Sequence, residues 1–222
     1  MRRPASPPAR LVLFAREPAP GRVKTRLAAA IGARRASDLY EAFLRDVAAA
    51  LVSPSWEPVV AADGGEARLR GIFGTAWRVV PQGGGTLGDR LARAAADAFA
   101  AGAERVALAG SDAPTMRAAD VAAALSALET SDLAVAPSPD GGFSLAALRA
   151  GTAAEDLFAA VRWSTRFAGA DLRRNAADLS LRVATLPEIQ DVDVADDLLP
   201  LRRRLAEDAG LAPATRAFLD TL

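Results

Sequence analysis

Strand-like and helix-like segments alternate along most of this chain, and that alternation constrains its fold more than any other feature. Short apolar runs of strand length are separated by longer segments whose apolar residues recur at helical spacing. Such a pattern predicts a layered α/β fold with a mostly parallel sheet and right-handed crossovers. The expected strands lie near residues 10–16, 58–62, 77–80, 105–109, 132–136, 143–148 and 181–186. The expected helices lie near residues 24–31, 34–51, 66–72, 87–101, 117–129, 153–160 and 167–177, with further helices to the end of the chain.

Two of the expected strands, 132–136 and 143–148, follow each other without a helix between them. The short connection contains Asp140-Gly141, and Asp-Gly is a strong signal for a hairpin turn. This pair of strands therefore predicts an antiparallel or edge element within a mixed sheet.

Length and composition indicate one folded domain. The chain has 222 residues, of which 51% are apolar and 24% are charged, which is sufficient for a full core. We expect residues 1–9, which are rich in Pro, Ala and Arg, to be a disordered tail, and residues 10–222 to form a single domain. No segment of signal-peptide type follows the basic N-terminus, and no apolar run approaches the roughly 20 residues that span a bilayer. We therefore expect a cytoplasmic protein with no membrane span.

The inventory of residues excludes several kinds of function. Lys plus Arg equals Asp plus Glu at 27 each, so net charge does not favour nucleic acid as a partner. The chain has no cysteine and no histidine, which excludes disulfides, thiolate or imidazole zinc sites and a Ser-His-Asp triad. Any chemistry must use carboxylates, Lys, Arg, hydroxyls or a hard metal ion. The oligomeric state is left open.

The segment Glu17–Leu27, after the first expected strand, places positive charge where a helix begins. Arg22, Lys24 and Arg26 stand there, although each cation near a helix start is unfavourable by about 0.3–1 kcal/mol. Lys24 is the only lysine among the 27 basic residues. Lysine is a compact charge on a flexible stem and is suited to reaching phosphate groups. The sequence therefore allows two interpretations of Lys24. It is either a phosphate-binding lysine or a lysine retained by chance at a solvated position.

Aspartates follow two other expected strands. Asp112 comes directly after the strand at 105–109, and one carboxylate there is a common way to hold a Mg²⁺ or Mn²⁺ that also contacts substrate phosphates. Asp191 and Asp193 follow the last strand and, as alternate residues of an extended segment, can point to the same place. Two carboxylates on one side repel each other unless a cation lies between them. The alternative is that Asp112 and Asp193 only cap the helices that follow.

Two further loops carry candidate ligand-binding residues. Asp140 can accept hydrogen bonds from a sugar or a base, and Gly141 and Gly142 allow a ligand to approach the backbone, although a simple turn explains them too. Ser164 precedes an expected helix and is a plausible N-cap as well as a ligand contact. Trp163, beside it, is either part of the core or a binding platform.

A glycine-rich run, Pro81–Arg90, opens the helix expected at 87–101. Its Gln82, Gly83 and Gly84 precede a helix start, where free backbone amides can hold an anion or the edge of a base. The run lacks both the Walker signature and the G-x-G-x-x-G spacing. A flexible loop without a ligand is the alternative.

These motifs occur in a familiar order. PxPGxxKTRL, QGGG…LGDRL, GSDxP, PxxDGG, WST and DVD-x-x-DDL resemble a bacterial family of GT-A-like transferases known as radical-SAM/selenodomain-associated transferases. That family is similar in turn to 2-phospholactate guanylyltransferase. The resemblance spans about residues 10–200. It implies a Rossmann-like nucleotide-diphospho-sugar transferase (GT-A) fold, a mixed and mostly parallel sheet with helices on both faces.

The residues and the resemblance together predict a site. Lys24, Asp112 and Asp140 are the expected catalytic residues, and Mg²⁺ or Mn²⁺ is the expected cofactor. The expected nucleotide contacts are Arg16, Pro20, Gly21, Arg22, Lys24, Arg26, Gln82, Gly83 and Gly84. The expected acceptor contacts are Asp140, Gly141, Gly142, Trp163 and Ser164, and the expected metal ligands are Asp112, Asp191 and Asp193.

The predicted function is a metal-dependent transfer from a nucleotide donor to a small acceptor. In one version an acceptor hydroxyl attacks the anomeric carbon of an NDP-sugar and the nucleoside diphosphate leaves. In the other, an acceptor phosphate attacks the α-phosphorus of an NTP and pyrophosphate leaves, as in the guanylyltransferase. Both depend on positioning and charge neutralisation, which suits a chain without His or Cys. A nucleotide-binding protein without catalytic activity is the alternative from another class.

Overall fold

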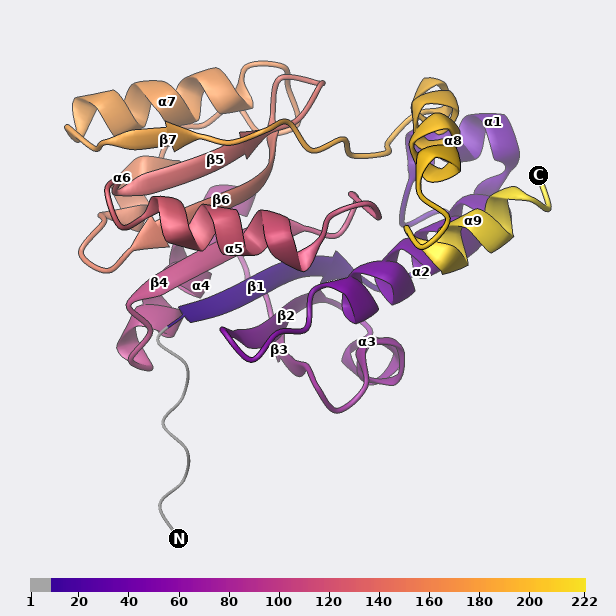
Figure 1. The fold of residues 1–222 in the computed structure, drawn as a ribbon, viewed down its shortest axis with the longest axis horizontal. Coiled ribbons are helices and arrows are strands. Elements are labelled where there is room, and N and C mark those ends of the chain that lie inside the picture. The colour runs from indigo at the N-terminus through magenta and orange to yellow at the C-terminus, as the bar shows by residue number, and fades with distance from the viewer. Residues whose placement is uncertain (1–8) are drawn as a thin grey trace, which may run out of the picture.

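The computed structural model describes residues 9–222, which are built around one seven-stranded sheet (Figure 1). The strand order across the sheet is β3-β2-β1-β4-β6-β5-β7. The strands are β1 (Ala9–Arg16), β2 (Glu57–Asp63), β3 (Arg78–Pro81), β4 (Arg105–Gly110), β5 (Leu133–Pro137), β6 (Phe143–Arg149) and β7 (Val183–Thr185). All seven were expected from the sequence.

Strand β6 runs antiparallel to both of its neighbours, β4 and β5, whereas every other pair in the sheet is parallel. The hairpin between β5 and β6 contains Asp140, as the Asp-Gly signal predicts. The sheet is therefore mixed and mostly parallel. Because β6 is reversed, its first residue lies at the edge of the sheet where the parallel strands end.

Helices cover both faces of the sheet, and the alternation of side chains along each strand separates two cores. Leu11 and Leu13 of β1 pack in one cluster with Phe43, while Val12 packs in the other cluster with Leu91. Fully burying one such side chain contributes about 1.5–3 kcal/mol. The helices that contribute to the first core are α1 (Thr25–Ile31), α2 (Ala33–Ala50), α3 (Glu66–Phe73), α5 (Ala118–Ala127), α8 (Leu198–Glu207) and α9 (Pro213–Leu219). Those of the second core are α4 (Leu87–Ala100), α6 (Ala154–Phe158) and α7 (Ala168–Asp178).

Helices α1, α8 and α9 gather to one side of the sheet, beyond the end of β1 (Figure 1). Asp46 of α2 holds α9 there, because its two carboxylate oxygens accept hydrogen bonds from the backbone amides of Ala214 and Thr215 at 2.9 and 2.7 Å. A short 3₁₀ helix, η1 (Ala195–Asp197), precedes α8 and contacts α1. The C-terminal part of the chain therefore returns to the loop that follows the first strand.

The fold class predicted from the sequence is confirmed, with small differences at the ends of elements. Residues 1–8 of the predicted tail lie outside the described part of the chain. Ala9, which the prediction also assigned to the tail, is instead buried as the first residue of β1. Within residues 9–222, no helix combines the length and the apolar character needed to cross a bilayer.

Candidate active site

Loops that follow three different strands bring Lys24, Asp112 and Asp193 together. Lys24 lies in the loop after β1, Asp112 in the loop after β4 and Asp193 in the segment after β7. The Lys24 Nζ atom is 2.5 Å from Asp112 Oδ1 and 2.7 Å from Asp193 Oδ1. The positive loop and the aspartate loops singled out from the sequence are thus parts of one site, at the edge where ligands bind in open α/β sheets.

Lys24 is buried at the centre of this site. Its side chain is only 4% exposed, and its Nζ atom lies 5.7 Å from the ring centre of Tyr40 and 5.9 Å from that of Phe43, within reach of cation–π attraction. Burial alone would lower the pKa of Lys24, but the carboxylates of Asp112 and Asp193 outweigh burial and hold this pKa above its usual value. Lys24 therefore carries a full charge, with aromatic rings on one side and carboxylates on the other.

The backbone of Lys24 is left-handed, with φ 48° and ψ 41°, at the N-cap of α1. A non-glycine residue in this region costs on the order of 1 kcal/mol or more, so the surrounding contacts must stabilise it. Its side chain makes no cap hydrogen bond with α1. Asp112 and Asp193 thus compensate a charge that the helix start disfavours.

Tyr40 connects the loops around Lys24. Its hydroxyl accepts a hydrogen bond from the backbone amide of Arg16 at 3.1 Å and shares another with Ser111 Oγ at 2.8 Å. Burial, together with the nearby carboxylate of Asp112, raises the pKa of Tyr40 to about 12. The sequence prediction missed Tyr40, although it is the only tyrosine in the chain.

Asp112 and Asp193 do not cap the helices that follow them. Helix α5 begins at Ala118 with Arg117 as its N-cap, well beyond Asp112. In the other loop, the carboxylate of Asp197 accepts hydrogen bonds from the amides of Asp193 and Val194 at 2.7 and 2.8 Å. The capping alternative is wrong at both positions, and the two carboxylates are directed to Lys24.

Beside the Lys24 ion pairs lies a cleft of about 200 Å³ lined mainly by charged residues. Burial, followed by the charges of Asp140 and Asp193, raises the pKa of Asp191 in this cleft to about 7. Asp140 is fixed by its own turn, because its Oδ1 accepts hydrogen bonds from Ser138 Oγ at 2.5 Å and from the Gly142 amide at 2.8 Å. The residues that line the cleft are Arg26, Pro139, Asp140, Asp191, Asp193, Val194 and Asp197.

The other candidate residues of the first loop, Pro20, Gly21, Arg22 and Arg26, are exposed. Pro20 and Gly21 occupy the centre of a turn closed by a 3.0 Å hydrogen bond from the Arg22 amide to Ala19 O, and Gly21 has the positive φ that such a turn requires. The Arg22 side chain is 68% exposed and lies 4.0 Å from Glu17. Of the exposed cations in this loop, Arg26 lines the acidic cleft and Arg22 does not.

The ends of β1 and β2 and the glycine-rich loop with the start of α4 form a second polar cluster. Arg16 pairs with Asp63 at 3.2 Å, and Arg90 reaches the same carboxylate at 3.4 Å. Gln82 points inward, where its amide nitrogen donates to Ala61 O at 2.9 Å and its Oε1 accepts from Arg90 at 3.1 Å. Gln82 therefore anchors the loop, while Gly83 and Gly84 are exposed.

Most of the residues predicted to bind the acceptor are engaged with other parts of the protein. Gly141 has φ +87°, and a Cβ atom there would collide with the carbonyl of Arg166, so this glycine permits close backbone packing. The ring centre of Trp163 lies 6.0 Å from that of Phe143 and 6.2 Å from that of Phe158. The structure places the partly buried Trp163 against the second core, whereas Ser164 is exposed and Gly142 is half-buried.

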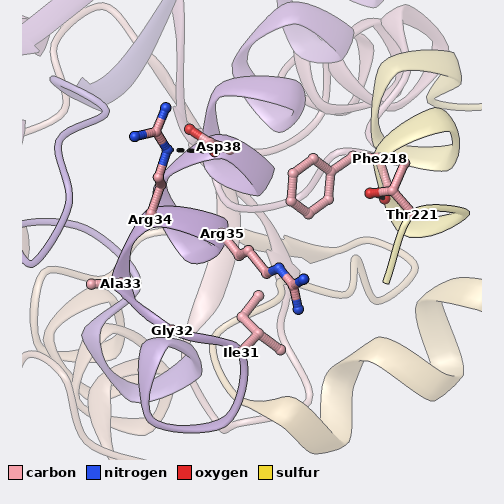
Figure 2. A pocket seen from close by; sticks show the side chains of 8 residues that line it. All are labelled: Ile31, Gly32, Ala33, Arg34, Arg35, Asp38, Phe218 and Thr221. Atoms are coloured by element: carbon pink, nitrogen blue, oxygen red, sulfur yellow. Dashed lines mark hydrogen bonds and ion pairs between the residues drawn. The ribbon is translucent and has the colours of Figure 1, made fainter.

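A second and larger hollow, about 670 Å³, is lined by other residues (Figure 2). It is formed by the junction of α1 and α2 and by the end of α9. Arg34 lies 4.0 Å from Asp38 there, and Phe218 and Thr221 face them from α9 and the last residues of the chain. None of the predicted site residues lines this hollow.

The carboxylate oxygens at the site are the type of ligand that a hard divalent cation prefers. Asp112 and Asp193 already surround one cation position, which the Lys24 ammonium fills. Within residues 9–222, no three side chains of His, Cys, Asp or Glu are placed to hold a metal ion by themselves, so Asp191 does not complete a three-aspartate cluster. Mg²⁺ commonly uses one or two carboxylates and takes further ligands from water and substrate phosphates. The pair Asp112 and Asp193 fits such an ion when phosphate accompanies it.

Solved structures with the same fold define its class as the Rossmann-like fold of nucleotide-diphospho-sugar transferases. A protein of Desulfovibrio desulfuricans G20, provisionally described as such a transferase, matches with a TM-score of 0.90 and 29% identity over 97% of this chain and 95% of that one. A CMP:2-keto-3-deoxy-manno-octonic acid synthetase complexed with CTP matches with a TM-score of 0.52 and 17% identity over 90% and 99% of the two chains. A 4-diphosphocytidyl-2C-methyl-D-erythritol synthase of Anaerococcus prevotii DSM 20548 matches with a TM-score of 0.55 and 10% identity, again over 90% and 99%.

The chain itself belongs to the family DUF2064, described as uncharacterized proteins conserved in bacteria, whose model matches residues 46–165. No curated protein matches it in sequence. The solved structures above are thus described as a nucleotide-diphospho-sugar transferase, a synthetase complexed with CTP and a synthase.

Proposed function

We propose that this protein is a transferase that uses a nucleotide donor, and that Lys24, Asp112 and Asp193 form the centre of its active site. The observation that carries the proposal is the buried Lys24 ammonium held between two carboxylates beside a cleft, at the carboxyl edge of the sheet. A buried ion pair of this kind is weak evidence for stability, because burying charge is costly. A role in binding and catalysis explains why the chain maintains it.

The nucleotide donor is inferred from the relatives. The described transferase from Desulfovibrio desulfuricans G20 covers nearly the whole chain, and more distant structures of the same fold include a synthetase complexed with CTP. In our proposal the donor phosphates lie beside the loop after β1, where Arg16, Arg22 and Arg26 are exposed. Pro20 and Gly21 shape this loop, and the amides of Gly83 and Gly84, which Gln82 holds in place, contact the nucleoside end.

In the mechanism, the residues of this chain position the reactants and neutralise charge. Lys24 donates hydrogen bonds to phosphate oxygens as negative charge develops on the leaving group. Asp112 and Asp193, with Asp191 beside them, would hold Mg²⁺ or Mn²⁺, which supplies further neutralisation of phosphate charge when bound. Arg26 lines the cleft that receives the acceptor in this proposal.

The acceptor side of the cleft is formed by the β5–β6 turn. We propose that Asp140, with Gly141 and Gly142, lies against the acceptor, and that Trp163 and Ser164 support this turn from the neighbouring loop. Asp140 Oδ1 is occupied by Ser138 and Gly142, which fixes the orientation of the carboxylate. Its other oxygen is the candidate base if the reaction is an inverting glycosyl transfer.

A thermal-shift screen of nucleoside triphosphates and NDP-sugars, with and without Mg²⁺, tests the proposal. A ligand at 100 times its dissociation constant stabilises the folded state by about 2.7 kcal/mol. A response to triphosphates alone supports nucleotidyl transfer, and a response to NDP-sugars supports glycosyl transfer. The absence of a shift with every nucleotide contradicts the proposal.

Substitutions locate the response in the site. We expect Lys24→Ala to abolish the nucleotide shift and Lys24→Arg to weaken it, because a planar guanidinium does not fit the position of a compact ammonium. Arg35→Ala is the matched control, since it removes a cation from the hollow of Figure 2 and leaves the cleft intact. An unchanged response in Lys24→Ala, or an equal loss in Arg35→Ala, contradicts this placement of the site.

A further inference from the structure

The Lys24 ammonium stands where two carboxylates converge, which is also where a divalent cation would bind. We propose that Lys24 is a tethered counter-cation that keeps divalent cations out of the Asp112–Asp193 pair in the free protein, and that the nucleotide admits the cation by drawing Lys24 to its phosphates. This inference rests on the proposed function, because it requires a phosphate-bearing ligand.

The distances leave no room for two cations on the same oxygens. Lys24 Nζ lies 2.5 and 2.7 Å from the Oδ1 atoms of Asp112 and Asp193. The Val192 amide donates to Asp112 O at 3.0 Å, which joins the two aspartate loops through their backbones and fixes the separation of the carboxylates. A divalent cation on these oxygens would meet the Lys24 charge at close range, where the repulsion is large.

The surroundings of Lys24 show in which direction it can move. The rings of Tyr40 and Phe43 lie near its ammonium, and its side chain is 4% exposed. Asp112 and Asp193 are 44% and 41% exposed, so their outer sides face solvent. The ammonium can therefore leave only past the carboxylates, and a phosphate group arriving there offers it a new anionic partner.

The consequence is that the divalent cation and the nucleotide bind with positive cooperativity. In the free protein, Lys24 neutralises part of the charge on the aspartate pair and competes with the cation. With the nucleotide bound, the same lysine neutralises phosphate and the pair becomes available. Each ligand then increases the affinity for the other by the same factor.

Titration of the metal-free protein with Mn²⁺, followed by electron paramagnetic resonance of the unbound ion, tests the exclusion. We expect weak Mn²⁺ binding by the wild type and at least about tenfold tighter binding by Lys24→Met, which is about 1.4 kcal/mol. Arg26→Met is the matched control, because it removes an equal charge from the adjoining cleft without changing the ion pairs of Asp112 and Asp193. Equal Mn²⁺ affinities of the wild type and Lys24→Met, or an equal gain in Arg26→Met, would overturn the proposal.

A second measurement uses only the wild-type protein and so does not depend on whether Lys24→Met folds. Because Lys24 is the only lysine, ¹³Cε-labelled lysine gives one side-chain signal in an NMR spectrum. We expect Mg²⁺ alone to leave this signal unchanged and Mg²⁺ with a nucleotide from the thermal-shift screen to move it. A shift of the same size with Mg²⁺ alone contradicts the proposal.

The two proposals fail in different ways. If no nucleotide stabilises the protein, the proposed function is wrong, whatever the metal affinities are. If nucleotides bind but the free wild type already holds Mn²⁺ as tightly as Lys24→Met does, only the counter-cation role is wrong.

Discussion

Two buried charges in this protein are compensated in opposite ways. Lys24 is a buried cation shared by the carboxylates of Asp112 and Asp193. Asp171 of α7 is a buried anion, 2% exposed, shared by the guanidinium groups of Arg162 at 2.8 Å and Arg174 at 3.2 Å. Hydrogen bonds from Arg162, through both its side chain and its backbone amide, hold the pKa of Asp171 well below its usual value.

The two sites differ in whether their carboxylates keep hydrogen-bonding capacity that a ligand could use. The Asp171 carboxylate is surrounded by donors from residues three and nine positions away, so its partners are local and its hydrogen-bonding capacity is used. The partners of Lys24 come from distant loops and leave partly exposed carboxylates beside the acidic cleft. The first arrangement stabilises a helix and its preceding loop, whereas the second retains negative charge that a ligand can use.

The largest effect is expected when Lys24 loses both partners. Asp112→Asn or Asp193→Asn alone leaves one carboxylate on the ammonium. Each single substitution should therefore lower the free energy of unfolding by about 1 kcal/mol. This is below the usual range for a hydrogen bond to a charged group, because the carboxylates are partly exposed. The double variant leaves a buried, unpaired cation and should lower the free energy of unfolding by about 3–5 kcal/mol. Urea denaturation of the four proteins measures the excess over additivity.

Glu207→Gln is the control for that cycle, because it breaks an exposed ion pair with Arg204 and should change the free energy of unfolding by less than about 0.5 kcal/mol. Additive costs of the two aspartate substitutions would show that Lys24 does not couple them.

The stability contributions of Asp191, beside the Lys24 site, and of Asp171 should depend on pH with opposite sign. Thermal unfolding in the presence of EDTA can measure this. The pKa of Asp191 is raised to about 7 in the folded protein, so this group contributes stability below about pH 4 that is lost as the pH rises through 7. Asp191→Asn should therefore become more stable than the wild type as the pH rises from about 4 to 7, with no further change above that.

For Asp171 the folded pKa lies below the unfolded value of about 3.9, so its contribution is present above pH 4 and is lost on acidification. Asp171→Asn should be less stable than the wild type at pH 7, and the difference should shrink below pH 4. The same sign of pH dependence in both variants would contradict the comparison.

A smaller effect than that of the double aspartate variant is expected for Tyr40, which connects the loops without an ion pair to Lys24. Tyr40→Phe keeps the ring near the ammonium but removes the hydroxyl that bonds to the Arg16 amide and to Ser111, and should cost about 1 kcal/mol of unfolding free energy. Chemical denaturation measures this loss, and the nucleotide shift should persist. A loss as large as that of the double aspartate variant would show that the hydroxyl, and not the carboxylates, maintains the site.

Most elements of the fold were predictable because each has a local signal. Short apolar runs marked all seven strands, and the Asp-Gly turn marked the reversed strand β6. The loops that contain Lys24, Asp112 and Asp193 were also identified, because parallel strands place their following loops at one edge. The ends of elements were less accurate, as at Ala9, because they depend on packing partners elsewhere in the chain.

Local signals were less informative about individual side chains. Gln82 was expected to contact a nucleotide, yet it points inward to the carbonyl of Ala61, because the register of β2 and β3 brings that acceptor near. Gly141 was expected to admit a ligand, yet it admits the carbonyl of Arg166, which only the packing of the following loop brings there. Tyr40 was missed because nothing in its own helix shows which loops its hydroxyl will reach.

The sequence by itself determined the layered α/β fold, the edge at which the polar loops gather and the absence of His and Cys chemistry, because periodicity and composition are properties of short segments. It also marked Lys24 as unusual. Only the tertiary structure decided that this lysine lies between Asp112 and Asp193, which are 88 and 169 residues away in the chain. The physical reason is that a buried charge is defined by its neighbours in space, and those neighbours come from different strands of one sheet.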